Sequence, residues 1–141
     1  MRTFVTMALL LATTSSYAQV DTTQDPNAGN RELTLQRYAI GGKKSILGSS
    51  YSLKMDCAPT DWQQVKIIKS PENGEAKLVD QNTFANYTAP NPRVKCNGKA
   101  VKAKALEYIP VKGYIGDDSI EVEMINDSGQ RIVWKFNVTV K

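Results

Sequence analysis

Five basic side chains gather within twelve positions of this sequence, and they are the first residues whose type and spacing suggest a binding chemistry. They surround Cys96 with no acidic residue between them: Arg93, Lys95, Lys99, Lys102 and Lys104. Such a cluster attracts an anionic partner, such as an anionic glycan, a lipid head group or an acidic protein. Interleaved aromatic residues, on which nucleic-acid bases would stack, are missing from this segment. The alternative interpretation is a solvated strand edge whose lysines deter aggregation.

A second group of residues is acidic and lies near the C-terminal end: Asp117, Asp118, Glu121, Glu123 and Asp127. Calcium takes about six to eight oxygen ligands, and a single small domain with these carboxylates offers only some of them. We therefore interpret these carboxylates as turn caps and as part of a solvated strand face. The sequence predicts no metal site and no cofactor.

Enzyme chemistry is disfavoured by the absence of histidine from all 141 residues. This removes the usual general base near neutral pH and every triad that needs an imidazole. Two cysteines without histidine also exclude a four-ligand zinc site of the usual Cys/His kind. Paired carboxylates could still hydrolyse a glycoside, but nothing in the sequence sets two acids across a cleft. We predict that the protein is not an enzyme.

Residues 1–18 have the pattern of a secretory signal peptide, with a short positive end, an apolar run and a small-x-small junction at Ser16-Tyr17-Ala18. The apolar run is too short for a permanent membrane span, and no later segment is apolar enough. We expect an exported, soluble protein, periplasmic or extracellular. The net charge of the whole chain is only +4, which does not suggest a nucleic-acid binder.

Export decides how the two cysteines, Cys57 and Cys96, are interpreted. Thiols in an oxidising compartment pair, and with two cysteines only one connectivity exists. A structural disulfide closing a loop of about forty residues stabilises the fold by roughly 4 kcal/mol. A redox role is disfavoured, because it would call for a Cys-x-x-Cys motif or a histidine.

The elements that must position these residues are predicted to be strands. The polar residues 19–30 are expected to be a flexible lead-in, so the folded domain spans 31–141. Period-two alternation predicts strands around Leu33 to Arg37 and Tyr51 to Met55, and a hairpin joins Val65–Lys69 to Glu75–Val79 through a turn at 70–74. Phe84–Thr88 and Ala103–Ile109 are further candidates.

The clearest element is a C-terminal hairpin around the turn 126–129. Its apolar side chains occupy one face of each strand, while polar residues such as Glu123 and Lys135 lie on the other. No segment combines a sustained helical period with a capping box. Short strands, a turn about every ten residues and no helix predict an all-β fold, a two-sheet antiparallel β-sandwich of about seven strands.

One segment near the end of the chain carries a spaced pattern of aromatic, turn and polar residues: Tyr108, Pro110, Gly113, Tyr114, Gly116, Asp118 and Ser119. This pattern resembles a signature of bacterial cadherin-like and immunoglobulin-like repeat domains. The resemblance is supported by a Pro-x-x-Gly turn at Pro71 and Gly74, and it covers about residues 65–141. The resemblance implies that the sandwich is immunoglobulin-like. Because such repeats usually occur in tandem and this chain has one copy, it does not carry over an adhesive function.

These observations predict a non-catalytic binding or interaction module of the periplasm or cell surface that presents the basic segment around Cys96. The expected partner is an envelope protein or an anionic glycan, and inhibition of an exported hydrolase is a special case. The alternative is a structural component of an envelope assembly. In that case residues 19–30 would be a tether or a strand donated to a neighbouring sheet.

Overall fold

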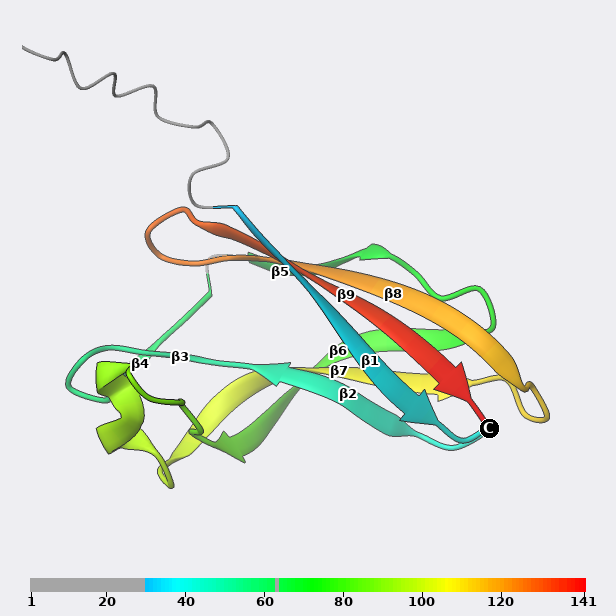
Figure 1. The fold of residues 1–141 in the computed structure, drawn as a ribbon, viewed down its shortest axis with the longest axis horizontal. Helices are drawn as coiled ribbons and strands as arrows, with labels where there is room; N and C mark the ends of the chain where they lie inside the picture. The colour runs from blue at the N-terminus through cyan, green and yellow to red at the C-terminus, as the bar shows by residue number, and fades with distance from the viewer. Residues whose placement is uncertain (1–29, 63) are drawn as a thin grey trace, which may run out of the picture.

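The protein is an all-β sandwich. The computed structural model describes residues 30–62 and 64–141, so the predicted signal peptide and nearly all of the predicted lead-in lie outside the described residues. The elements are β1 (Arg31–Ala39), β2 (Ser45–Ser50), β3 (Ser52–Leu53), β4 (Pro59–Thr60), β5 (Gln64–Lys69), β6 (Gly74–Phe84), η1 (Pro92–Cys96), β7 (Ala100–Pro110), β8 (Gly116–Ile125) and β9 (Arg131–Val140). Figure 1 shows two layers of strands facing each other. The predicted fold class is confirmed.

The order of the strands is that of an immunoglobulin-like sandwich. One sheet has the order β1-β9-β8-β5 and the other β2-β7-β6, with β3 and β4 forming a separate small pair. The seven long strands match the predicted number. One pair departs from the antiparallel prediction, because β1 runs parallel to β9. After β1 the chain turns at Gly42, whose φ is 72°, and enters the opposite sheet as β2 instead of folding back along β1.

The main core fills the space between the two sheets. Its buried side chains come from both layers: Ala39, Leu47, Leu106, Tyr108, Ile120, Val122, Met124, Phe136, Val138 and Val140. Strands β8 and β9 pair as the predicted C-terminal hairpin. Because successive side chains of a strand point to opposite sheet faces, the alternation along the hairpin places residues such as Ile120, Val122 and Phe136 in the core.

Glu123 differs from its predicted place in water. It is only 7% exposed, because Lys66 and Arg131 reach over it from the neighbouring strands, with the Lys66 ammonium 2.9 Å from a carboxylate oxygen. These two cations lower the pKa of Glu123 below its usual value. The outer face of this sheet therefore carries a compact ion-pair cluster.

The predicted hairpin between Val65–Lys69 and Glu75–Val79 is wrong. Strand β5 pairs with β8, and β6 pairs with β7 in the other sheet. The turn at Pro71 to Gly74 therefore crosses from one layer to the other. Alternation identified both strands correctly, but it carries no information on which sheet each one joins.

Two other predicted strands are misplaced. Of the strand expected at Tyr51 to Met55, only the short β3 (Ser52–Leu53) forms. The long strand of this region is β2 at Ser45–Ser50, where a bulge between Ile46 and Gly48 breaks the alternation. Met55 lies in a turn and is 47% exposed. The strand expected at Phe84–Thr88 is the last residue of β6 followed by a loop.

Candidate functional site

A second, smaller core lies at one end of the sandwich. We call residues 51–60 and 84–101 the disulfide lobe. Its centre consists of Leu53, Ala85, Cys96 and Val101, with Tyr51, Cys57 and Tyr87 packed around them. Figure 1 shows β3, β4 and η1 at the end of the molecule opposite the C-terminus. The predicted disulfide is confirmed: Cys57 and Cys96 are bonded across 39 positions of sequence, and Cys96 is completely buried.

Hydrogen bonds fix the loop between β6 and β7 as part of this lobe. The Asn97 side chain accepts from Tyr87 N at 2.6 Å and donates to Tyr87 O at 2.9 Å. Asn86 N donates to the Tyr51 hydroxyl at 2.6 Å, and Ala85 N donates to the carbonyl of Lys99. Because its backbone groups are bonded at both ends, the loop holds one conformation around the disulfide.

Short-range capping explains why the chain forms η1 here. Pro92 stands at the start of the helix, where a missing N–H costs nothing, and the Asn91 side chain accepts from Arg93 N at 2.9 Å. The helix ends at Cys96, which anchors it to the lobe core. The side chains of Val94 and Lys95 are left in solvent.

The five predicted basic residues do not share one free surface. Arg93 donates its Nε–H to the carbonyl oxygen of Leu53 at 2.6 Å, so its guanidinium ties η1 to β3. The Lys104 ammonium pairs with Asp80 at 2.6 Å. Lys95 and Lys99 are exposed at the lobe.

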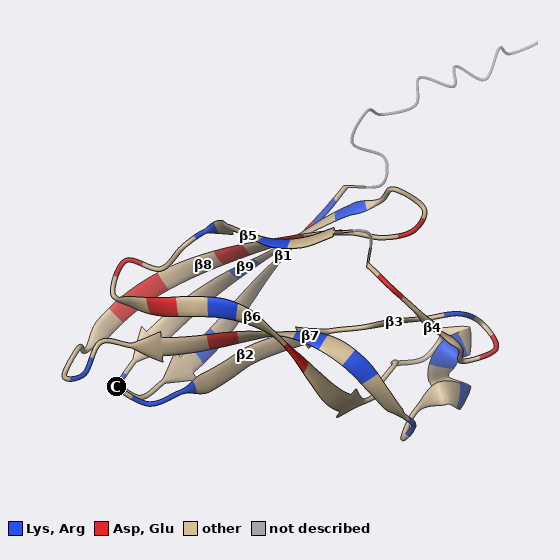
Figure 2. Ribbon diagram, turned by 180° about the vertical axis from the view of Figure 1, so that it is seen from behind, with Lys and Arg blue, Asp and Glu red and all other residues tan. Residues whose placement is uncertain are grey.

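Lys102 and Lys104 lie on strand β7, apart from Lys95 and Lys99. Val101 points into the lobe core, so its neighbour Lys102 points to the other face of the sheet. There Lys102 and Lys104 line a hollow with Asp61, Trp62 and Asp80. Figure 2 shows the basic residues of η1 and of β7 at different places on the ribbon. The sequence therefore placed five charges together that lie on η1, in the loop after it and on one face of β7.

The disulfide adds residues that the sequence interpretation missed. The turn that carries Cys57 brings Lys54 and Met55 beside η1, where Val94 is 40% exposed. We call Lys54, Met55, Val94, Lys95 and Lys99 the lobe surface. Asp56 in the same turn accepts a hydrogen bond from Ala58 N at 3.0 Å. The Cys57–Cys96 prediction was the signal that could have found these neighbours, because it joins residues 39 positions apart.

The predicted signature residues meet at the opposite end of the sandwich and form a hydrogen-bond network. Tyr108 is fully buried and donates its hydroxyl to Asp118 at 2.7 Å. The Asp118 carboxylate also accepts from Glu72 N and Asn73 N, both at 3.0 Å, and from Ser119 N at 2.8 Å. We call these groups the signature network. It fastens the turn before β6 to β7 and β8.

The glycines and the remaining signature residues shape the turn between β7 and β8. Gly113 and Gly116 have φ values of 82° and 145°, which side chains rarely adopt. Tyr114 covers this turn and donates its hydroxyl to Asp117 O at 2.7 Å. Pro110 ends β7. These contacts give the signature a structural role at this end of the fold.

Electrostatics agree with that role. Burial raises the pKa of Asp118, but hydrogen bonds from Glu72 N, the Tyr108 hydroxyl, Asn73 N and Ser119 N outweigh it and lower the pKa below its usual value. Burial and the charge of Asp118 raise the pKa of Tyr108. Asp118 is therefore an ionised cap with its oxygens occupied. Among the residues that the structure describes, no three His, Cys, Asp or Glu side chains are placed to hold a metal ion.

No family model matches the chain, and no curated protein matches it. Among solved structures, one titled "Structure of PbICP-C in complex with falcipain-2" is similar at a TM-score of 0.31 and 13% sequence identity, over 79% of this chain and 89% of that chain. A likeness at that TM-score carries no function across. Within 30–62 and 64–141, no helix is long and apolar enough to cross a membrane.

Proposed function

We propose that this protein is an exported, non-catalytic interaction module of the periplasm or cell surface that binds an acidic protein partner through the lobe surface. The observation that supports this proposal is the pairing of exposed apolar and basic side chains on a disulfide-anchored frame. Met55 and Val94 are 47% and 40% exposed, and Lys54, Lys95 and Lys99 are exposed on the same lobe. Apolar contacts provide affinity, while the lysines favour an acidic partner and its rate of encounter.

The frame matters because a binding loop that is already ordered loses little conformational entropy on association. The Cys57–Cys96 bond, the paired bonds between Tyr87 and Asn97, and the Arg93 contact to Leu53 O all hold η1 in place without a partner. A special case of this proposal is that the acidic partner is an exported hydrolase, which the bound lobe surface inhibits. We also propose that the domain is a single copy of a cadherin-like or immunoglobulin-like repeat domain.

Charge reversal at the lobe surface tests the proposal. Affinity capture from the native envelope fraction would be run with the wild-type protein and with Lys95→Glu/Lys99→Glu. Both side chains are exposed, so this change leaves the fold intact. We expect a protein captured by the wild type to be lost, and its Kd, measured with the purified partner, to rise more than about tenfold.

The matched control is Lys43→Glu/Lys112→Glu, which makes the same change in net charge at the opposite end of the sandwich. Capture of the partner should survive this control. Equal capture by the two double variants would show that the lobe surface does not bind the partner.

A further inference from the structure

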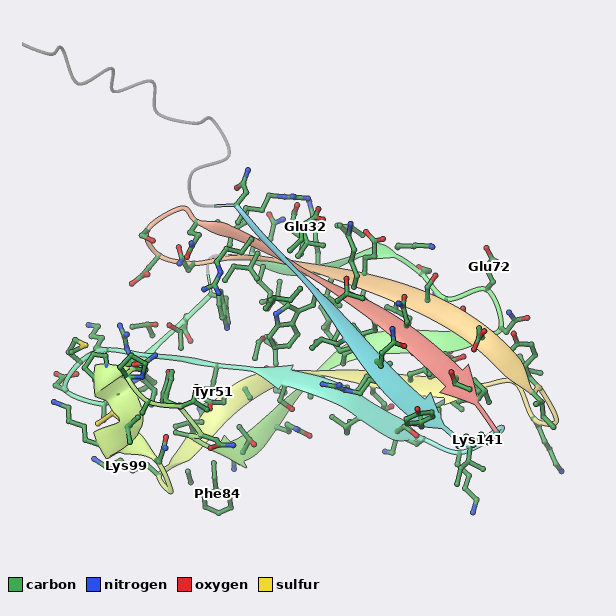
Figure 3. All side chains as sticks on the ribbon, in the orientation of Figure 1. Glu32, Tyr51, Glu72, Phe84, Lys99 and Lys141 are labelled. Atoms are coloured by element: carbon green, nitrogen blue, oxygen red, sulfur yellow. A yellow bond between two sulfur atoms is a disulfide. The ribbon has the colours of Figure 1, made fainter. Side chains whose placement is uncertain are left out.

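Three segments meet at the end of the sandwich that lies opposite the disulfide lobe. Gly41 N donates to Lys141 O at 3.2 Å, Gly42 N to Pro110 O at 3.0 Å, and Lys141 N to Ala39 O at 2.9 Å. These bonds join the turn after β1, the turn after β7 and the end of β9 into one platform. We call residues 38–44, 110–115 and 141 the loop tip. Figure 3 labels Lys141 at this end and Lys99 at the other.

The loop tip presents four large apolar or aromatic side chains to solvent. Tyr38, Ile40, Val111 and Ile115 are 68%, 54%, 58% and 77% exposed. They project from turns and strand ends, while the core beneath them is already filled by buried residues such as Ala39, Tyr108 and Val140. Folding alone therefore gives no reason to place these side chains here. Exposed apolar groups gathered on neighbouring turns are typical of an interaction site.

Positive charge surrounds these apolar side chains. Lys43, Lys112 and Lys141 are all exposed, and the Lys141 ammonium lies 4.6 Å from the centre of the Tyr38 ring. Lys44 is paired with Glu107 at 3.3 Å. The three segments of the loop tip contain no acidic residue. In Figure 2 the turns next to the C-terminal end carry blue segments, and the nearest red segments lie in the turn between β5 and β6 and at the start of β8.

We propose that the loop tip docks on the surface of an anionic phospholipid bilayer. Ile40, Val111 and Ile115 would enter the boundary between head groups and acyl chains, and the lysines would contact phosphates. Tyr38 has the amphipathic ring that favours the interface. This proposal uses a different end of the molecule from the lobe surface, so it stands or falls independently of the proposed function.

The shape of the loop tip favours a bilayer over an acidic protein. Side chains that project from turns need a matching pocket in a protein partner, whereas a bilayer accommodates them without one. Each lysine near an anionic surface strengthens binding by about fivefold, and each buried apolar side chain adds a comparable factor. Several such weak contributions are required for stable attachment to a bilayer, and the loop tip provides both lysines and apolar side chains.

Vesicle co-sedimentation tests this proposal directly. The wild-type protein would be mixed with vesicles of equal parts phosphatidylglycerol and phosphatidylcholine, and with vesicles of phosphatidylcholine alone. We expect binding to the anionic vesicles at low salt and loss of most binding on the neutral ones. Raising the salt concentration should weaken binding, because it screens charges at the surface.

Two tip variants separate the contributions. Val111→Ser/Ile115→Ser and Lys43→Glu/Lys112→Glu should each reduce the partition onto anionic vesicles by about tenfold or more. The matched controls lie elsewhere: Phe84→Ser removes an exposed apolar side chain, and Lys95→Glu/Lys99→Glu makes the same charge change. Both controls should retain wild-type partition, and thermal melts would confirm that every variant is folded.

Three outcomes would overturn the proposal. The wild type would fail to bind anionic vesicles, or the tip variants would bind as well as the wild type, or the control variants would lose as much binding as the tip variants. If the vesicles are not bound but the tip variants abolish capture of an acidic protein, the loop tip belongs to a protein partner instead of a bilayer.

Discussion

The two ends of this sandwich are held together by different means. At the disulfide lobe a covalent bond joins Cys57 to Cys96 around a small core. At the other end the signature network joins Tyr108, Asp118 and the turn at Glu72 through hydrogen bonds to one carboxylate. A covalent bond is sensitive to reductant and insensitive to acid, and a carboxylate cap is the reverse. Reductant should therefore weaken the disulfide lobe and spare the signature network, and protonation of Asp118 should do the reverse.

The largest effect should come from removing the disulfide. In Cys57→Ala/Cys96→Ala the unfolded chain regains the freedom of a loop of 39 positions, and the free energy of unfolding should fall by about 4 kcal/mol. Urea unfolding of the variant and of the wild type measures this loss. Hydrogen exchange should show the strongest loss of protection in residues 84–101. Unchanged exchange in the lobe would contradict the role assigned to the bond.

The next effect should come from removing the carboxylate at the other end. Asp118→Ala leaves the buried Tyr108 hydroxyl and the amides of Glu72, Asn73 and Ser119 without their acceptor. The free energy of unfolding should fall by about 3 kcal/mol. Exchange should now increase in the turn before β6, while the lobe keeps its protection. A uniform increase across both ends would show that the two ends are not separate.

Removing the hydroxyl alone should have a smaller effect. Tyr108→Phe keeps the buried ring and deletes one hydrogen bond to the ionised Asp118. The free energy of unfolding should fall by about 1.5 to 2 kcal/mol, less than in Asp118→Ala. The double variant Tyr108→Phe/Asp118→Ala should lose little more free energy of unfolding than Asp118→Ala alone, because both single changes remove the same hydrogen bond. Full additivity in this cycle would argue against the contact.

Acid should weaken the end that carries the signature network. Because the pKa of Asp118 is lowered in the fold, its contribution is complete above the unfolded value of about 3.9 and is lost as the pH falls through the folded value. Thermal melts of the wild type and Asp118→Asn between neutral pH and pH about 2 should converge as the pH falls. Other carboxyls with lowered pKa values, Glu32, Glu107 and Glu123, contribute to both proteins alike. Parallel curves would contradict the assignment, and reductant should leave the difference unchanged.

The smallest effect should come from the exposed pair of Lys104 and Asp80 between the two ends. The pair is short, at 2.6 Å, but both side chains are largely in solvent. Asp80→Asn should change the free energy of unfolding by no more than about 0.5 kcal/mol. A larger loss by urea unfolding would show that the two ends are coupled through β6 and β7.

The sequence predicts strands well where apolar and polar residues alternate over most of the strand. This held for β8 and β9, and their pairing followed because one turn separates them. It failed at β2, where Leu47 is buried beside a bulge and Gly48 faces Phe136 and leaves no apolar signal. A pattern of period two reports the face of each strand, and it does not report the sheet to which the strand belongs.

The candidate sites depended on contacts that no local pattern contains. The disulfide could be predicted because two cysteines allow one pairing, but the neighbours it brings to η1 could not. The five basic residues were predicted as one segment, yet Arg93 bonds to Leu53 O and Lys102 lies on the opposite face of β7 from Val101. The loop tip joins segments about seventy positions apart, and only the fold brings Ile40 near Val111.

The parallel pairing of β1 with β9 has a mechanical consequence. Arg31 lies beside Ile132 and Ala39 beside Val140, so the start of β1 and the end of β9 point in opposite directions along one axis. A force that pulls these two ends apart slides the strands lengthwise and loads their nine residue pairs together. An antiparallel hairpin pulled from its open end would instead separate one pair at a time. Strands β1 and β9 are therefore arranged as a shear clamp.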